Sequence, residues 1–193
     1  MIRIGILGDI GSGKSSVAKN FGYPVFNADQ EVGKLYKKDR KIFLKFKKVL
    51  PKYISTFPLK KSEISKAILD NRNNLKKIVK IVHFEIRKKL DFFLKKNKKK
   101  RFVILDIPLL LENKLNKKND ILVYVHTNKS LIIKRLNNGL DLNKKLLKKF
   151  RSLQLPLVYK KDKSQFIINN NFSKKSVKRE TRNILKNLNQ WKK

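Results

Sequence analysis

The fold of this chain is decided by Gly8-Asp9-Ile10-Gly11-Ser12-Gly13-Lys14-Ser15, which matches G-x-x-x-x-G-K-[ST] at every defined position. Residues 2–7 before it form an apolar run that predicts a short buried strand. A helical pattern begins after it with Val17, Ala18 and Phe21. A loop that joins a first strand to a first helix is the context in which this pattern predicts a phosphate-binding loop, or P-loop.

The residue types of the P-loop predict its chemistry. Its glycines let the backbone turn tightly, so that successive N–H groups and the helix N-terminus face one concavity that favours an anion. We expect Lys14 to reach the β and γ phosphates of a nucleotide and the Ser15 hydroxyl to hold Mg²⁺. The predicted nucleotide-binding residues of this segment are Gly8, Asp9, Ile10, Gly11, Ser12, Gly13, Lys14, Ser15 and Ser16.

Length and composition favour one α/β domain. A chain of 193 residues can bury a substantial core. Apolar runs alternate with helical stretches, a pattern typical of a mainly parallel sheet. No run of eighteen apolar residues is present, so we expect no membrane span, and there is no cysteine for a disulfide or a reactive thiolate. A cytoplasmic protein is the simplest expectation.

The formal charge of +36 would ordinarily suggest a nucleic-acid partner. However, the chain has 41 lysines against 9 arginines, together with 19 asparagines. Lysine and asparagine have A/T-rich codons, so compositional drift produces such a charge without a selected binding surface. Arginine, which reads guanine edges and phosphates, is not enriched. We therefore expect nonspecific polyanion binding at low salt, and no specific nucleic-acid partner.

The apolar pattern also predicts the order of the elements. Strands are expected at residues 2–7, 23–26, 102–105, 121–125 and 166–168. Helices are expected from residue 17 and over residues 30–50, 129–136, 142–153 and 177–188, with a break at Asn137-Asn138-Gly139. Residues 62–97 have apolar residues at helical spacing but are too many for a simple crossover, so they predict an inserted helical lobe.

Two carboxylates follow predicted strands. Asp29 comes after the second strand and Asp106 ends the third. Ligands of doubly wound sheets lie beyond the carboxyl ends of the strands, where the P-loop is also expected. Phosphoryl transfer to a hydroxyl needs a carboxylate that orients or accepts its proton, and this role suits Asp29. It also needs the metal positioned near the phosphates, and Asp106 suits either a Mg²⁺-linked role or a substrate-orienting one. A helix N-cap or a loop position is the alternative for either residue.

With these residues the chain resembles the dephospho-coenzyme A kinases, which use ATP to phosphorylate the ribose 3′-hydroxyl of dephospho-CoA. The resemblance covers residues 4–170. The P-loop is close to the family's Gly-Gly-Ile-Gly-Ser-Gly-Lys-Ser, and Asn27-Ala28-Asp29 resembles its Asp-Ala-Asp. The further matching segments are Val82–Arg87 (His-Pro-x-x-Arg), Leu105–Glu112 (Asp-x-Pro-Leu-Leu-Phe-Glu), the lid residues Arg135, Gln154 and Pro156-Leu157, and Ile168-Asn169-Asn170 (Ile-Asp-Asn).

The resemblance implies a role for each matching residue. Asp29 corresponds to the catalytic base, and Lys14 and Arg135 complete the catalytic set. Asn170 belongs to the segment that approaches the adenine of ATP. The substrate-binding residues implied for dephospho-CoA are Asp29, His83, Arg87, Asp106, Pro108 and Leu109.

The chain departs from the family pattern at several positions. Asp9 stands where the family usually has glycine; its carboxylate would weaken phosphate binding if it pointed inward and would be harmless if it pointed outward. Asn27 replaces the first aspartate, and Phe84 replaces the proline after the histidine. Gly139 stands where a lid arginine is expected, so Arg151 or a lid lysine is the candidate replacement.

The sequence therefore predicts one dephospho-CoA-kinase-like domain with a P-loop nucleoside triphosphate hydrolase fold. The expected parts are a core (1–56, 98–135 and 161–193), a helical substrate lobe (57–97) and a lid (136–160). The expected activity is ATP- and Mg²⁺-dependent formation of CoA by a monomer or a weak homo-oligomer. The alternatives are another P-loop small-molecule or nucleotide kinase, a basic nucleic-acid-binding protein, and a decayed kinase that only binds nucleotide.

Overall fold

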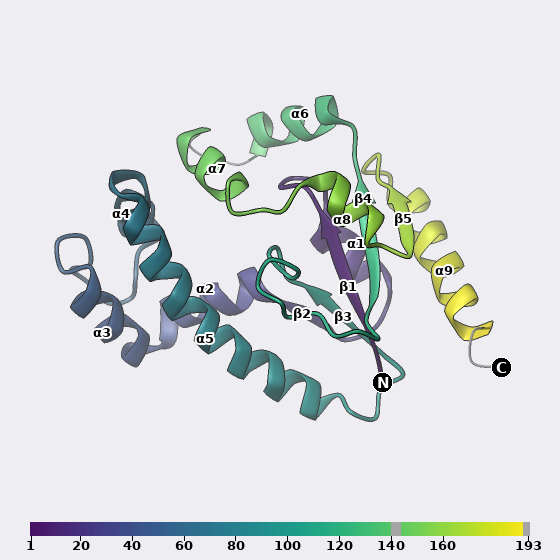
Figure 1. The fold of residues 1–193 in the computed structure, drawn as a ribbon, viewed down its shortest axis with the longest axis horizontal. Helices are drawn as coiled ribbons and strands as arrows, with labels where there is room; N and C mark the ends of the chain where they lie inside the picture. Colours follow the sequence, from purple (N-terminus) through teal and green to yellow (C-terminus); the bar gives the residue numbers. More distant parts are fainter. Residues whose placement is uncertain (140–143, 191–193) are drawn as a thin grey trace. The chain divides into compact units, whose positions relative to one another are not determined.

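Five parallel strands form one sheet (Figure 1). The structure, a computed structural model, describes residues 1–139 and 144–190. The strands are β1 (Ile2–Gly8), β2 (Val25–Asn27), β3 (Phe102–Asp106), β4 (Ile121–His126) and β5 (Phe166–Asn169). Their order across the sheet is β2-β3-β1-β4-β5. The predicted α/β fold with a parallel sheet is confirmed.

The strand order positions the P-loop. Parallel strands need crossover connections, and their carboxyl ends share one edge of the sheet. The chain leaves β1 toward β2 on one side, whereas β4 pairs with β1 on the other, so β1 lies where the strand order switches. At this edge Gly8 of β1 is in register with Val125 of β4, and Asn27 of β2 is in register with Asp106 of β3.

The helices belong to two compact units, and each unit is described by itself. The first unit has the sheet and described residues 1–27, 97–139 and 150–190; the second has residues 28–96 and 144–149. The second unit thus includes residues 57–96 of the predicted substrate lobe together with the two helices before it. The helices are α1 (Lys14–Asn20), α2 (Ala28–Lys38), α3 (Arg40–Val49), α4 (Lys61–Asp70), α5 (Arg72–Lys96), α6 (Lys129–Gly139), α7 (Lys144–Arg151), α8 (Leu157–Asp162) and α9 (Lys174–Gln190).

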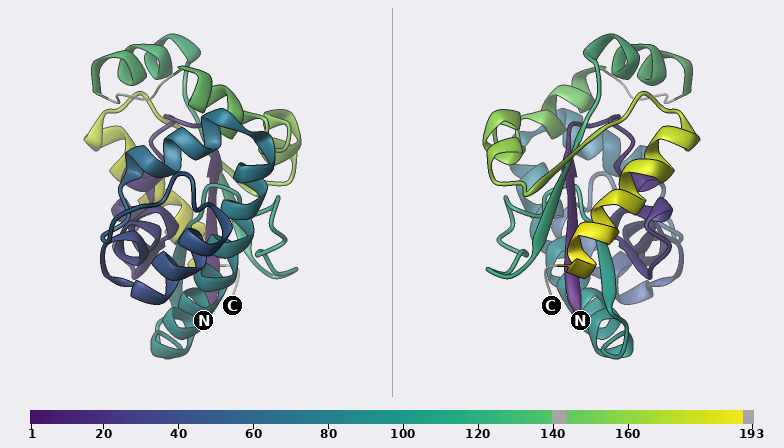
Figure 2. Two further views of the ribbon diagram at one scale, coloured as in Figure 1. Left: turned by 90° about the vertical axis from the view of Figure 1, so that its left-hand side faces the viewer. Right: turned by 90° about the vertical axis from the view of Figure 1, so that its right-hand side faces the viewer.

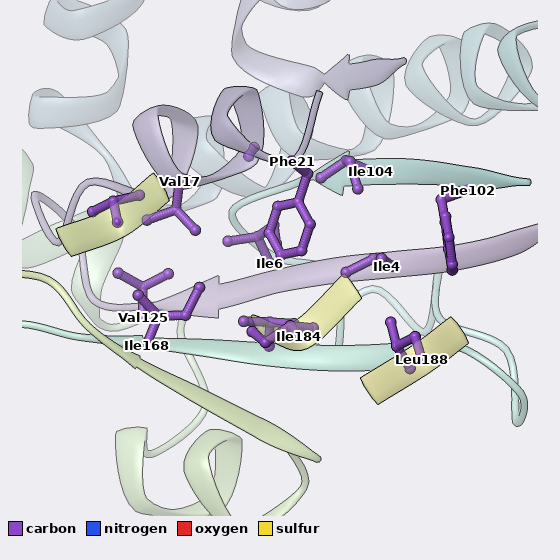
Figure 3. Close-up of a cluster of buried hydrophobic side chains, with 13 residues drawn as sticks. Ile4, Ile6, Val17, Phe21, Phe102, Ile104, Val125, Ile168, Ile184 and Leu188 are labelled. Atoms are coloured by element: carbon purple, nitrogen blue, oxygen red, sulfur yellow. The ribbon is translucent and has the colours of Figure 1, made fainter. Parts of the chain in front are cut away.

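One face of the sheet forms a hydrophobic core with α1 and α9 (Figure 3). Alternate residues of the strands face this core, as the two-residue period of a strand requires. Ile4 and Ile6 of β1 contribute from the centre of the sheet, and both are fully buried. The remaining labelled members are Val17, Phe21, Phe102, Ile104, Val125, Ile168, Ile184 and Leu188.

The opposite face of the sheet is covered by α8 and by the loop after β3 (Figure 2). Gly5 of β1 allows that loop to approach closely. A Cβ at Gly5 would lie 2.5 Å from Leu110 Cδ2 and 3.0 Å from Leu122 Cδ2. Both faces of β1 are therefore buried, which explains why this strand is a continuous apolar run in the sequence.

The structure corrects several predicted helix boundaries. The helix expected over residues 30–50 is two helices, because the Asp39 carboxylate accepts the Ile42 N–H at 3.0 Å and begins a new helix. The helix expected to end at Leu136, with a break at Asn137-Asn138-Gly139, extends through these three residues, since α6 ends at Gly139. Helix α8 follows Pro156 where the sequence pattern predicted none. Residues 140–143 of the predicted lid lie outside the described residues.

Within residues 1–139 and 144–190, no helix is both long and apolar enough to cross a membrane.

Candidate active site

The P-loop has a backbone that only its glycines can readily adopt. Gly8, Gly11 and Gly13 have φ angles of 146°, 85° and 89°. At Gly8 a Cβ would lie 2.7 Å from the Val125 carbonyl oxygen, and at Gly13 it would overlap the amide nitrogen of Asn170. The glycines therefore serve both the sharp turn and the close packing of the loop against the ends of β4 and β5.

Two side chains from neighbouring strand ends hold the P-loop in place. The Thr127 hydroxyl and the Asn170 amide both donate to the Ser12 carbonyl oxygen, at 3.0 and 2.8 Å. Asn170 is 3 % exposed, and its Oδ1 accepts the Phe172 N–H at 2.9 Å. The predicted adenine-segment residue Asn170 thus links the P-loop, through Nδ2, to the backbone of Phe172, through Oδ1. Thr127 was missed, because a single threonine after a strand gives no sequence signal.

Lys14 folds back over the loop. Its Nζ donates to the carbonyl oxygens of Asp9 at 2.7 Å and Gly8 at 3.2 Å. These contacts keep the ammonium group at the mouth of the loop. A cation held there is suited to phosphate oxygens, as the sequence predicts for this residue.

The Asp9 carboxylate is shared between the loop backbone and an arginine. Its Oδ1 accepts the Ile10 N–H at 2.6 Å, and its Oδ2 lies 3.5 Å from a guanidinium nitrogen of Arg151. Burial, and after it the Asp9 charge, raises the pKa of Tyr124. Arg151 therefore contacts the P-loop by pairing with Asp9, the residue at which the loop departs from the family pattern.

Oxygen ligands gather beside the P-loop at the edge of the sheet. The Asn27 amide donates to Asp106 Oδ2 and lies 3.4 Å from the Ser15 hydroxyl. Asp106 is 3 % exposed. A hydroxyl and a carboxylate are hard oxygen donors of the kind Mg²⁺ prefers when phosphates supply the remaining ligands, so these residues fit that ion. Among the described residues there is no cluster of three or more acidic, histidine or cysteine side chains that could hold a metal by itself.

A pocket of about 420 Å³ adjoins the first turn of α1. Leu131 and Arg135 of α6 line one part of it, and Asn170, Phe172 and Val177 line another. Its volume falls in the ordinary range for small-molecule sites. The structure thus brings the predicted residues Ser16, Arg135 and Asn170 together around one pocket.

The second unit holds three of the predicted substrate residues, Asp29, His83 and Arg87. Asp29 is exposed in the first turn of α2, two residues after Asn27. His83 and Arg87 lie one turn apart on α5. Burial, and after it the nearby Arg87 charge, lowers the pKa of His83 from its ordinary value of 6.5. His83 is therefore neutral near pH 7, while Arg87 supplies a charge that suits an anionic substrate.

The loop after β3 contains Pro108 and Leu109, both partly buried. This loop is tied to the start of α8 by Glu112. Glu112 Oε1 accepts the Leu155 N–H at 3.0 Å and pairs with Lys160 Nζ at 2.6 Å. The side chains of Lys160 and Glu112 are 1 % and 9 % exposed, so this ion pair is buried within the first unit. Glu112 lies in one of the matching sequence motifs, whereas no sequence pattern marks Lys160.

The P-loop at the switch point of a parallel sheet defines this chain as a P-loop kinase by fold. Two examples of solved structures with this fold follow. The TT1252 protein of Thermus thermophilus matches with a TM-score of 0.77 and 26 % identity, covering 97 % of both chains. The dephospho-CoA kinase of Campylobacter jejuni matches with a TM-score of 0.66 and 20 % identity, covering 99 % of this chain and 98 % of that one.

Within the P-loop kinases, similarity in sequence shows the family to which this chain belongs. Residues 2–176 match the family model described as dephospho-CoA kinase. The dephospho-CoA kinase of Wolbachia pipientis is 35 % identical over 191 residues, which cover 96 % of this chain and 97 % of the relative. The chain belongs to the dephospho-CoA kinase family, as the sequence motifs predicted.

Proposed function

We propose that this chain transfers the γ-phosphoryl group of ATP to the ribose 3′-hydroxyl of dephospho-CoA, giving CoA and ADP. This reaction is the last step of CoA biosynthesis. Membership of the dephospho-CoA kinase family is the observation that carries the proposal. The braced P-loop, with Lys14 at its mouth and Ser15 near Asp106 through Asn27, supports it.

In this proposal the P-loop binds the triphosphate and Lys14 neutralises charge on the β and γ phosphates. Ser15, with Asp106 nearby, would hold Mg²⁺, whose positive charge would offset the negative charge of the phosphates. Arg135 and Asn170 belong to the nucleotide side, because both line the pocket beside α1. Arg151, paired with Asp9, is the candidate for the cation expected at Gly139.

Asp29 is the proposed catalytic base. The 3′-hydroxyl oxygen forms a bond to the γ phosphorus as the bond to the β–γ bridging oxygen breaks, and the hydroxyl proton passes to the Asp29 carboxylate. ADP leaves with the bridging oxygen. Asp29 follows Asn27 by only two residues, and Asn27 is at the end of β2 and contacts Asp106. This short separation along the chain supports the role of Asp29.

His83 and Arg87 are proposed to bind dephospho-CoA, with Pro108 and Leu109 as further contacts. Residues 136–160 are proposed to act as the lid that excludes water during transfer. We further propose that the enzyme acts in the cytoplasm as a monomer or weak homo-oligomer.

A substrate panel tests the assignment. Purified protein with ATP and Mg²⁺ is given dephospho-CoA, adenosine monophosphate, cytidine monophosphate or shikimate, and ADP release is measured. We expect turnover with dephospho-CoA at least about 100-fold above each other acceptor, because the acceptor contacts are specific to one substrate. Preference for a nucleoside monophosphate or shikimate would favour another P-loop kinase, and binding of ATP without turnover would favour a decayed one.

A further inference from the structure

Phe172 has a backbone conformation that bulky residues rarely adopt. Its φ angle is 65°, in the left-handed region. The Phe172 N–H donates to Asn170 Oδ1 at 2.9 Å, and Asn170 in turn holds the Ser12 carbonyl oxygen of the P-loop. Residues in such conformations gather at ligand sites, where the surroundings hold them in place. The turn therefore fixes an aromatic ring relative to the P-loop.

The contacts of the Phe172 ring place it directly beside the P-loop. Its Cε1 lies 3.1 Å from the position that a Cβ of Gly13 would take. The guanidinium carbon of Arg135 lies 4.9 Å from the centre of the ring, within the range of a cation–π interaction. The Arg135 guanidinium, itself a flat and polarisable group, thus occupies one face of the ring in this structure.

The pocket around Phe172 has the chemistry that an aromatic base with attached phosphates needs. Its apolar wall is formed by Leu131, Phe172 and Val177, and its cations are Lys134, Arg135 and Lys174. Ser16 of α1 joins the pocket to the P-loop. Phosphates at the P-loop would therefore leave an attached base next to the ring.

We propose that Phe172 is a specificity-determining residue of the phosphoryl-donor site: its ring stacks on the purine base, in place of the Arg135 guanidinium. This inference rests on the proposed use of ATP as donor. Stacking on an aromatic side chain favours a nucleotide over phosphates without a base, because the ring contacts only the base. The left-handed turn serves this function by holding the ring beside the P-loop.

The test compares a nucleotide with the same phosphates lacking a base. Binding of the nonhydrolysable analogue AMP-PNP and of inorganic tripolyphosphate, both with Mg²⁺, is measured by calorimetry. We expect Phe172→Gly to weaken AMP-PNP binding about 10-fold or more and to leave tripolyphosphate binding within about twofold of wild type. In turnover, its KM for ATP should rise while kcat and the KM for dephospho-CoA stay near wild type.

Three further variants distinguish the stacking of the Phe172 ring on the base from effects of the left-handed backbone conformation. Phe172→Asn also tolerates the left-handed turn and should behave like Phe172→Gly if that variant does not fold. Phe172→Tyr keeps the ring and should bind AMP-PNP like wild type. Lys114→Gly is the matched control, because exposed Lys114 has a left-handed φ of 51° away from the pocket and should change neither affinity.

Each contrary result has a distinct meaning. Equal loss of AMP-PNP and tripolyphosphate binding in Phe172→Gly, or no loss of either, overturns the stacking role. A loss shared by Lys114→Gly overturns it as well. Wild-type protein that binds tripolyphosphate but not AMP-PNP would also contradict it, whereas wild type that binds neither would overturn the proposed donor site itself.

Discussion

Asp9 places a negative charge in the loop that is proposed to bind phosphates. The structure bonds one of its oxygens to the loop backbone and brings the other near Arg151, with side-chain exposures of 16 % for Asp9 and 45 % for Arg151. Because this pair is partly exposed, its effect on folding stability is small. In the proposed complex with ATP its effect would be larger, since Asp9 would repel the phosphates and Arg151 would attract them.

Asp9→Gly should lower the KM for ATP about 3-fold, because it removes a repelling charge near the triphosphate. Arg151→Ala should raise the same KM by a similar factor. Steady-state kinetics at varied ATP, with the temperature of unfolding as a stability control, measures both. A higher KM in Asp9→Gly would mean that the carboxylate supports the loop more than it repels the nucleotide.

Asp29→Asn should reduce kcat at least about 100-fold, because an amide does not accept the hydroxyl proton. The affinity for AMP-PNP should stay unchanged, since the nucleotide side does not use Asp29. Asp91→Asn, at an exposed aspartate of α5, is the matched control and should keep wild-type kcat. Near-wild-type turnover in Asp29→Asn would remove the residue from the role of base.

Among the elements, α8 depends on a buried ion pair. Lys160 of α8 is held by Glu112, which also accepts the Leu155 N–H just before the helix. Removing one partner of a buried pair leaves an unpaired charge in a low-dielectric environment, which costs far more than the pair itself contributes. The pair therefore secures the position of α8 against the loop after β3.

Lys160→Met should lower the free energy of unfolding by about 3 kcal/mol, because Glu112 is then left buried without its cation. Lys161→Met changes the adjacent, exposed lysine of the same helix and should change stability by less than about 0.5 kcal/mol. Urea unfolding followed by circular dichroism compares the two variants. Equal stabilities would show that the Lys160–Glu112 pair does not anchor α8.

The sequence predicted those elements that local patterns determine. The buried strands and the P-loop glycines follow from apolar periodicity and one motif. The features it did not predict depend on tertiary contacts or on a local helix cap. Lys160 is one lysine among 41, and only the fold buries it. Phe172 adopts a glycine-like turn because Asn170 and the P-loop hold it there, and Asp39 divides the helix predicted over residues 30–50 through a cap that spacing alone did not identify.

The whole molecule carries a formal charge of +36 with a large excess of lysine. A charge of this size attracts any polyanion at low ionic strength, whether the charge arose by selection or by compositional drift. Attraction of anionic substrates such as ATP is an additional consequence. The charge alone gives no base recognition, because bases are read by specifically placed side chains.

Binding to random-sequence oligonucleotides should therefore weaken steeply with salt, with a linear fall of log affinity against log salt concentration. It should be lost near physiological ionic strength and be equal for different sequences. Fluorescence anisotropy over a salt series measures this, with a scrambled and an alternating oligonucleotide as paired probes. Tight, sequence-dependent binding at physiological salt would favour a selected nucleic-acid function.

The phosphoryl transfer itself tests the central claim most directly. Purified protein is incubated with ATP, Mg²⁺ and dephospho-CoA, and the products are separated and identified by mass spectrometry. The proposed function predicts CoA and ADP in equal amounts, with the new phosphate on the ribose 3′-oxygen. No CoA above background over a full range of Mg²⁺ concentrations, from protein that binds AMP-PNP, would contradict it.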